Sequence, residues 1–298
     1  MTFAQFCELQ GLVMDRGLIE GRWVRVKTVD KPLHRNGAYK FMGDHGHCQN
    51  HATQTEVSTW RADGASATAK AIDPAKLRAQ RDRERAGRIQ AMRSAREFWQ
   101  QARPLSRPHP YIERKGLSPL GCAGLRQHNG LLVVPVWLGD WIISVQTITA
   151  DGEKRFWPGA PVKAGACVMV RPRAAVTVFV EGLATGLAIY QSVRMAAVVV
   201  AFNAGNLLPV VDRMRPTGSV VVAGDNDWGT QARRGINPGI QKATNAAELI
   251  GCGVWWPEGI EGTDAADYLK EVGQGAGRQI ERQILAKARY VSPMVAAP

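Results

Sequence analysis

The sequence predicts an α/β protein: a parallel sheet flanked by helices, preceded by a mixed α+β basic subdomain and a small N-terminal antiparallel β module. Residues 176–180 and 220–223 are runs of β-branched and apolar residues, which is typical of strands buried on both faces of a parallel sheet. Helical segments separate these strands from two more that are expected at 196–201 and 252–256. Strand and helix therefore alternate, as in a sheet with right-handed crossovers.

The composition indicates a soluble protein with a polyanionic partner. The 298 residues suffice for about two domains; 45% of them are apolar and the net charge is +12, which favours nucleic acid or an anionic surface as partner. No apolar run approaches the ~20 residues that span a bilayer, and the N-terminus lacks a signal-peptide pattern. We therefore expect no membrane partner and a cytoplasmic location, in the host cell if the protein is phage-encoded. Five scattered cysteines predict reduced, mostly buried thiols.

Residues 1–62 are expected to form the small β module. Apolar residues at helical spacing predict a short helix within residues 1–20. Residues 21–27 alternate apolar and basic side chains, as in a half-exposed strand. Asn36-Gly37 is a hairpin turn signal that leads into a second strand.

Basic and aromatic side chains are interleaved in this module, the mixture with which proteins follow phosphates and stack bases. Three basic residues are expected to contact nucleic acid: Arg22, Arg25 and Lys40. The aromatic residues among them are Trp23, Tyr39, Phe41 and Trp60. The same aromatic residues are equally consistent with the core of a tiny sheet.

The module also contains a group of zinc-ligand types: His34, His45, His47, Cys48 and His51. Imidazole and thiolate are the usual ligands of zinc. Their spacing matches no standard zinc pattern, and neighbouring residues of a strand point to opposite faces. A zinc site is therefore possible but not favoured, and polar surface residues are the better interpretation.

Residues 63–103 are predicted to be a linker followed by a basic helix. Small polar residues form the linker, and Asp73-Pro74 supply an N-cap and a first helical residue. The helix is expected to run to about Gln101. The helix carries many arginines. A solvated helix that connects two domains is the preferred interpretation, and a contact with nucleic acid is the alternative.

Residues 104–170 are predicted to form the basic subdomain, as a meander of antiparallel strands. Apolar strands at 130–137 and 141–148 are joined by a Gly139-Asp140 turn. The meander is expected to gather four side chains into a ridge: Gln146, Lys154, Arg155 and Lys163. Such a ridge would bind the phosphates of nucleotides, although a basic sheet edge also guards against aggregation.

Residues 171–298 contain the acids that end the buried strands. Glu181 follows one strand, and Asp225 and Asp227 follow another. In open α/β sheets the ligand lies beyond the carboxyl ends of the strands. Acids that converge there need a cation, and oxygen-only ligation favours Mg²⁺ or Mn²⁺.

Three further polar residues are candidates for the same place. Asp264 and Asp267 are expected metal ligands, although Asp264 could equally cap the helix that follows it. Asn203 follows the strand at 196–201, so it could contact the substrate or cap the next helix.

The acid motifs also carry a resemblance. Glu181-Gly-Leu-Ala-Thr-Gly186 and Asp225-Asn-Asp227 resemble the signature of the Toprim domain, which is shared by bacterial-type primases, topoisomerases, OLD-type nucleases and RecR-like proteins. The resemblance covers roughly residues 171–273. His109-Pro-Tyr-Ile-Glu-Arg-Lys115 and the N-terminal module resemble elements of phage and plasmid primases.

This resemblance implies a DNA primase that synthesises short RNA primers by two-metal nucleotidyl transfer. It implies Glu181, Asp225 and Asp227 as metal ligands and catalytic residues, with Lys154 as a catalytic lysine of the ridge. The implied partners are a single-stranded DNA template and ribonucleoside triphosphates. The sequence contains no P-loop, so a separate replicative helicase is expected.

Other functions compete with this interpretation. A Toprim nuclease would use the same acids to activate water, and the upstream basic ridge favours the primase over it. A topoisomerase needs a strand-gating body for which 298 residues leave no room. A non-catalytic nucleic-acid-binding accessory protein would gain nothing from three acids, which weaken the binding of phosphates.

Overall fold

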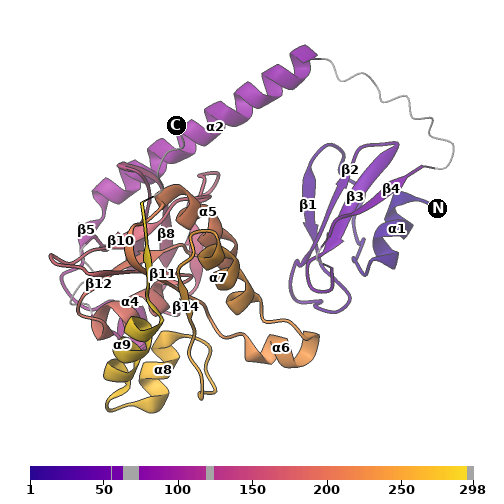
Figure 1. Ribbon diagram of the computed structural model, residues 1–298. Helices are drawn as coiled ribbons and strands as arrows, with labels where there is room; N and C mark the ends of the chain where they lie inside the picture. Colours follow the sequence, from indigo (N-terminus) through magenta and orange to yellow (C-terminus); the bar gives the residue numbers. More distant parts are fainter. Residues whose placement is uncertain (55, 63–73, 119–123, 294–298) are drawn as a thin grey trace. The chain divides into compact units, whose positions relative to one another are not determined.

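The computed structural model describes residues 1–54, 56–62, 74–118 and 124–293 (Figure 1). The chain divides into two compact units, residues 1–79 and 80–298, each with its own hydrophobic core. The finer predicted division into four parts stays a prediction, and the predicted linker at 63–73, with Asp73, lies outside the described residues. No helix among the described residues is long and apolar enough to cross a membrane.

The first unit is a four-stranded antiparallel sheet with one short helix. The strands pair in the order β1-β2-β3-β4. Their bounds are Trp23–Val26, Gly37–Phe41, His45–Asn50 and Ser58–Arg61. Helix α1, Phe3–Leu9, confirms the short helix expected within residues 1–20 and begins with a capping box between Thr2 and Gln5.

The predicted hairpin turn at Asn36-Gly37 is wrong, because Gly37 is the first residue of β2. Glycine is required there for a different reason. A Cβ at Gly37 would lie 2.9 Å from Leu12 Cγ, so the chain packs too closely for any larger residue. A packing glycine and a turn glycine look alike in the sequence.

Helix α2, Pro74–Gln101, confirms the predicted basic helix. Residues 81–90 are exposed on every side. The last turns are anchored in the second unit, where Ala95 and Trp99 are buried and Trp99 packs with Val133 and Val145.

A five-stranded antiparallel sheet follows, in the order β5-β6-β7-β8-β9. Its strands are Arg103–Pro104, Arg126–His128, Leu131–Leu138, Trp141–Ile148 and Lys154–Phe156. This is the predicted meander. Helix α3, Pro110–Arg114, is capped by His109, whose ring accepts a hydrogen bond from the Tyr111 amide.

The second unit is centred on a six-stranded sheet with a parallel core. The order is β10-β12-β11-β13-β14, and β15 pairs with β13 beside β14. The strands are Cys167–Met169, Ala196–Val200, Val176–Val180, Gly218–Ala223, Gly253–Trp255 and Arg289–Val291. The four predicted strands are parallel to one another, and the sequence did not indicate that β10 and β15 would add antiparallel pairs.

Helices cover both faces of this sheet (Figure 1). Helices α4, α8 and α9 share one core with Val178, and α5 and α7 share the other with Phe179. Their bounds are Leu183–Ser192, Ala265–Val272, Ala276–Lys287, Ala204–Met214 and Pro238–Glu248. The cysteines in the described part of the chain, Cys7, Cys48, Cys167 and Cys252, are buried, as predicted.

Candidate active site

Two neighbouring parallel strands place their acids at the same end of the sheet. Val180 of β11 pairs with Ala223 of β13, so the residues that follow each strand leave the sheet side by side. Glu181 is the next residue of the first strand, and Asp225 lies two residues beyond the second. We call Glu181, Asp225 and Asp227 the acid edge.

Glu181 is a partly buried carboxyl group with neighbours of both signs. Its burial and the charge of Asp227 raise its pKa, whereas a hydrogen bond from the Ala204 backbone and the charge of Lys154 act in the opposite direction. The net effect is a raised pKa. Lys154 belongs to the antiparallel sheet, so two separate sheets contribute to the electrostatics of this one carboxyl group.

Asp225 is the most perturbed acid of the site. Its burial, together with the negative charges of Glu181, Asp264 and Asp227, raises its pKa to about 8. One group opposes the shift: the Thr185 hydroxyl donates a hydrogen bond to Asp225 Oδ1 at 3.2 Å. Thr185 lies in the first turn of α4 and is itself buried.

Asp227 precedes helix α6, Trp228–Arg234, and is held by the start of α7. The Gly239 amide donates to Asp227 Oδ2 at 3.1 Å, and the Asp227 amide donates to Asn237 Oδ1 at 3.1 Å. A Cβ at position 239 would collide with the carbonyl oxygen of Asp225. Gly239 therefore allows α7 to approach the backbone of the acid edge.

The donor chemistry of the acid edge fits a hard divalent cation, because it consists of carboxylate oxygens without histidine or cysteine. Mutual repulsion in a half-buried place is the condition that a cation would relieve. As the side chains stand, no three His, Cys, Asp or Glu residues of the described chain are grouped closely enough to hold an ion. Each acid is instead oriented by its own donor, from Ala204, Thr185 or Gly239.

The structure separates Asp264 from Asp267, which the sequence grouped together. Asp264 caps α8 by accepting from the Asp267 amide at 2.9 Å, and its charge still contributes to the raised pKa of Asp225. Asp267 uses both oxygens elsewhere: Oδ1 lies 3.3 Å from Lys115 Nζ, and Oδ2 accepts from the Thr263 amide at 3.1 Å.

The structure also separates two residues of the predicted ridge, Lys154 and Arg155, because successive residues of a strand point to opposite faces. Lys154 and Phe156 share the face of β9 that meets the parallel sheet. Phe156 packs on Phe202 with ring centroids 5.7 Å apart, and Lys154 lowers the pKa of Glu181. Arg155, on the opposite face, is engaged with Glu153, with Nη2 at 2.7 Å from Oε1.

The loop that carries Lys163 is joined to the segment that carries Asn203 by Asn206, a residue that the sequence did not single out as functional. Buried Asn206 accepts from the Ala164 amide at 2.7 Å and donates to the Gly165 and Ala201 carbonyls, each at 2.9 Å. It thereby fastens the loop that carries exposed Lys163 to the end of β12. Asn203 is exposed and is the N-cap residue of α5, but its side chain makes no capping hydrogen bond.

The N-terminal sheet has a buried face and an open face. Cross-strand pairing places Trp23, Lys40, His47 and Thr59 in one row, and Arg25 and His45 lie on the same side. We call Trp23, Arg25, Lys40, His45 and His47 the open face. Arg22 is exposed immediately before β1.

Of the four aromatic residues considered for base stacking, three belong to the core: Tyr39, Phe41 and Trp60. The interpretation as stacking residues is wrong for these three. Tyr39 and Trp60 are buried, and Phe3 stacks on Phe41 with ring centroids 5.2 Å apart. Only Trp23, which is 50% exposed, presents its indole on the open face.

The residues considered for zinc are divided in the same way. His47 points to the open face and bonds Thr59 Oγ1 at 3.1 Å, whereas Cys48 lies in the core. His45 bonds Asp44 at 2.7 Å. Among the described residues, no three His, Cys, Asp or Glu side chains gather here closely enough to hold a metal ion.

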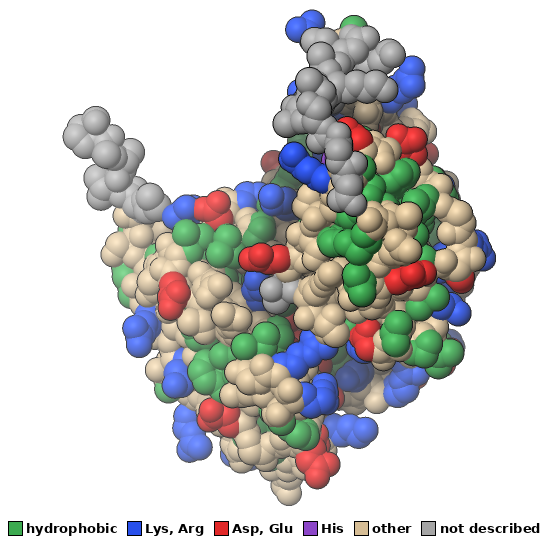
Figure 2. Space-filling model, turned by 90° about the vertical axis from the view of Figure 1, so that its right-hand side faces the viewer, with side chains coloured by type: hydrophobic (Ala, Val, Ile, Leu, Met, Phe, Trp, Pro, Cys, Tyr) green, Lys and Arg blue, Asp and Glu red, His purple; other side chains and the backbone are tan. Residues whose placement is uncertain are grey.

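Lys and Arg side chains are spread over the face shown in Figure 2, with acidic ones among them. Such a distribution attracts a polyanion over a wide area.

Comparison with known proteins gives one family and several relatives. Residues 176–275 match the family model described as Toprim domain. The chain is 30% identical over 296 residues to a DNA primase TraC of Escherichia coli, which covers 91% of this chain and 27% of the relative. A second Escherichia coli DNA primase TraC is 27% identical over 228 residues, covering 69% of this chain and 15% of the relative. The chain thus spans about a quarter or less of the length of these curated relatives.

Among solved structures, the chain is similar to the DnaG primase catalytic domain bound to ssDNA. The TM-score is 0.40 at 15% identity, over 68% of this chain and 82% of that one. The primase fragment of the bacteriophage T7 primase-helicase protein gives a TM-score of 0.39 at 12% identity, over 60% and 73%.

Proposed function

We propose that this chain, a Toprim-domain protein related to the plasmid primases, synthesises short RNA primers on single-stranded DNA. The observation that carries the proposal is the meeting of two sheets at one site. The parallel sheet supplies Glu181, Asp225 and Asp227, and the antiparallel sheet supplies Lys154, whose charge acts on Glu181. Acids alone would repel a nucleotide, so a polymerase needs fixed positive charge facing them.

In this proposal the acid edge binds the cation, and Lys154 of the antiparallel sheet binds phosphates. Glu181, Asp225 and Asp227 would hold a divalent cation, Mg²⁺ or Mn²⁺, which would supply charge to stabilise the triphosphate and to lower the pKa of the attacking hydroxyl. Lys154 binds the nucleotide phosphates from the opposite side. Thr185 and Gly239 orient the carboxylates through their hydrogen bonds, and the exposed residues Lys163 and Asn203 contact nucleotide or template nearby.

The open face of the N-terminal sheet binds the single-stranded template in this proposal. Trp23 stacks a base, and Arg25 and Lys40, with Arg22 before the strand, contact phosphates. Ribonucleoside triphosphates are the substrates, and a replicative helicase on another chain is the partner that delivers single strands.

The proposal is tested by incubating the chain with single-stranded DNA, labelled ribonucleotides and Mg²⁺ or Mn²⁺. The wild type is expected to make new short oligonucleotides, and the double variant Asp225→Asn, Asp227→Asn is expected to make none. Asp140→Asn, an exposed acid in the β7–β8 hairpin, is the matched control and should remain active. Degradation of the template by the wild type alone would instead identify a nuclease. DNA binding without any product would identify a non-catalytic binding protein.

A further inference from the structure

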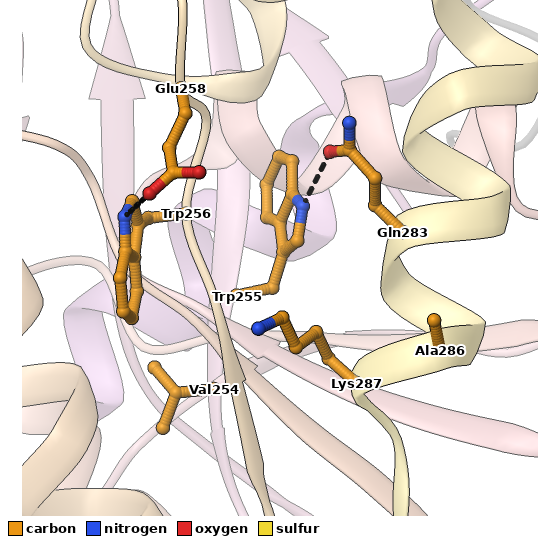
Figure 3. A pocket seen from close by; sticks show the side chains of 7 residues that line it. All are labelled: Val254, Trp255, Trp256, Glu258, Gln283, Ala286 and Lys287. Atoms are coloured by element: carbon orange, nitrogen blue, oxygen red, sulfur yellow. Dashed lines mark hydrogen bonds between the residues drawn. The ribbon is translucent and has the colours of Figure 1, made fainter.

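A cavity of about 260 Å³ lies between β14 and α9 (Figure 3). One side is formed by Val254, Trp255, Trp256 and Glu258, and the other by residues of α9 that include Gln283 and Lys287. None of these residues belongs to the site described above. We call this cavity the indole slot.

The indole slot is fastened to the acid edge by the backbone. Trp255 pairs with Ala223 of β13, and its carbonyl oxygen accepts from the Gly224 amide at 2.9 Å. The side chain of Asn226, between the two aspartates, donates to the Pro257 carbonyl at 2.9 Å. The strand that lines the slot therefore ends beside the strand that delivers Asp225 and Asp227.

The polar groups of both indoles are already satisfied. Trp255 Nε1 donates to Gln283 Oε1 at 2.9 Å, and Trp256 Nε1 donates to Glu258 Oε1 at 3.0 Å. These bonds fix the two rings, and of the two indoles it is Trp256 that keeps an accessible face for contact with a ligand (Figure 3). Trp255 is buried and forms part of the core, whereas Trp256 is only half-buried.

Lys287 gives the slot a positive charge. Its side chain extends from α9 toward the strand that carries Trp255 (Figure 3). Among the ion pairs of the described residues, none involves Lys287. An aromatic face and an ammonium group that is in no ion pair with the described residues, lining the same cavity, are the groups that bind a flat base and its phosphate.

We propose that the indole slot binds one nucleobase of single-stranded nucleic acid close to the acid edge. The base stacks on Trp256, its polar edge meets the free oxygen of Glu258, and Lys287 contacts the neighbouring phosphate. The inference rests on the proposed function only in taking nucleic acid as the partner.

The test measures binding without nucleotides or divalent cations, so it does not depend on primer synthesis. The full chain is titrated with fluorescent oligo(dT), and Trp256→Ala is expected to bind about 10-fold more weakly. Trp256→Phe retains a ring and should stay within about 3-fold of the wild type. Trp141→Ala removes another exposed indole, which lies outside the slot, and should have no effect.

Charge is tested with a matched pair on α9. Lys287→Gln and Arg282→Gln each remove one positive charge from an exposed position of the same helix, but only Lys287 lines the slot. The slope of log K against log salt should fall by about 0.7 for Lys287→Gln, the value for one single-strand phosphate contact. It should fall by less for Arg282→Gln.

Crosslinking identifies the contact directly. Oligonucleotides that contain 5-iodouracil are expected to attach to the peptide that carries Trp256. Equal affinities of Trp256→Ala, Trp141→Ala and wild type, together with a crosslink elsewhere, would overturn the proposal. If the chain makes no primers but the crosslink maps to Trp256, the slot stands and the proposed function fails.

Discussion

The acid edge and the open face of the N-terminal sheet both consist of side chains carried by or next to strands, but the sequence predicted the acid edge better than the open face. The acid edge lies at strand ends, where a run of buried residues stops and a carboxylate follows. The open face depends on which side of each strand is buried, and a shift of one residue reverses that assignment. Chemistry at the end of a buried strand can therefore be located without knowing the register, and chemistry on a sheet face cannot.

The largest difference should appear between the two faces of β9. Lys154→Met is expected to lower primer synthesis about 100-fold, because Lys154 is the cation that acts on Glu181. Arg155→Met should lower synthesis by less than about 3-fold, because Arg155 is paired with Glu153 on the other face. Initial rates at saturating nucleotide and template measure both. Equal losses of primer synthesis in the two variants would contradict a specific role of Lys154 in the active site.

A second test separates the two faces of the N-terminal sheet. Trp23→Ala should weaken template binding several-fold without changing the melting temperature, since Trp23 is half exposed. Trp60→Ala should lower the free energy of unfolding by about 3 kcal/mol, because it leaves a cavity in the aromatic core. Template titration and denaturant unfolding measure the two effects. Loss of stability in Trp23→Ala would contradict the assignment of faces.

Some features of the site could be predicted from the sequence, and others could not. The buried runs and their terminal acids predicted the parallel strands and placed Glu181 with Asp225 correctly at one end of the sheet. The sequence could not show that Asp267 faces Lys115, because the two lie 152 residues apart and an ion pair leaves no local pattern. Asn206 and Thr185 looked like ordinary helix residues, since only the packing of distant loops gives their polar groups partners.

A third prediction concerns the role of Asp267. Its carboxylate fixes Thr263, whose carbonyl accepts from the Asn226 amide at 2.7 Å, so it supports the acid edge from behind. Lys115→Met should then weaken Mn²⁺ binding by a few-fold, because Asp267 loses its partner. If Asp267 were instead a metal ligand, removal of the competing lysine would strengthen Mn²⁺ binding. Titration with Mn²⁺ distinguishes the two signs.

The smallest expected effect is a pH dependence of stability in divalent-free buffer. The folded-state pKa of Asp225 is raised from 3.8 to about 8. The folded protein therefore retains a proton that the unfolded chain releases, and stability falls as pH rises from about 4 to about 8. Asp225→Asn should remove part of that decline, so its melting temperature should exceed that of the wild type by a few degrees at pH 8 and match it near pH 4. Asp140→Asn should show no such difference.

The most direct test of the acid edge is calorimetric titration of the chain with Mn²⁺ at neutral pH. We predict that the wild type binds Mn²⁺, that Asp225→Asn with Asp227→Asn abolishes the binding, and that Asp140→Asn leaves it unchanged. Equal binding by the wild type and the double variant would place the metal elsewhere and contradict the account.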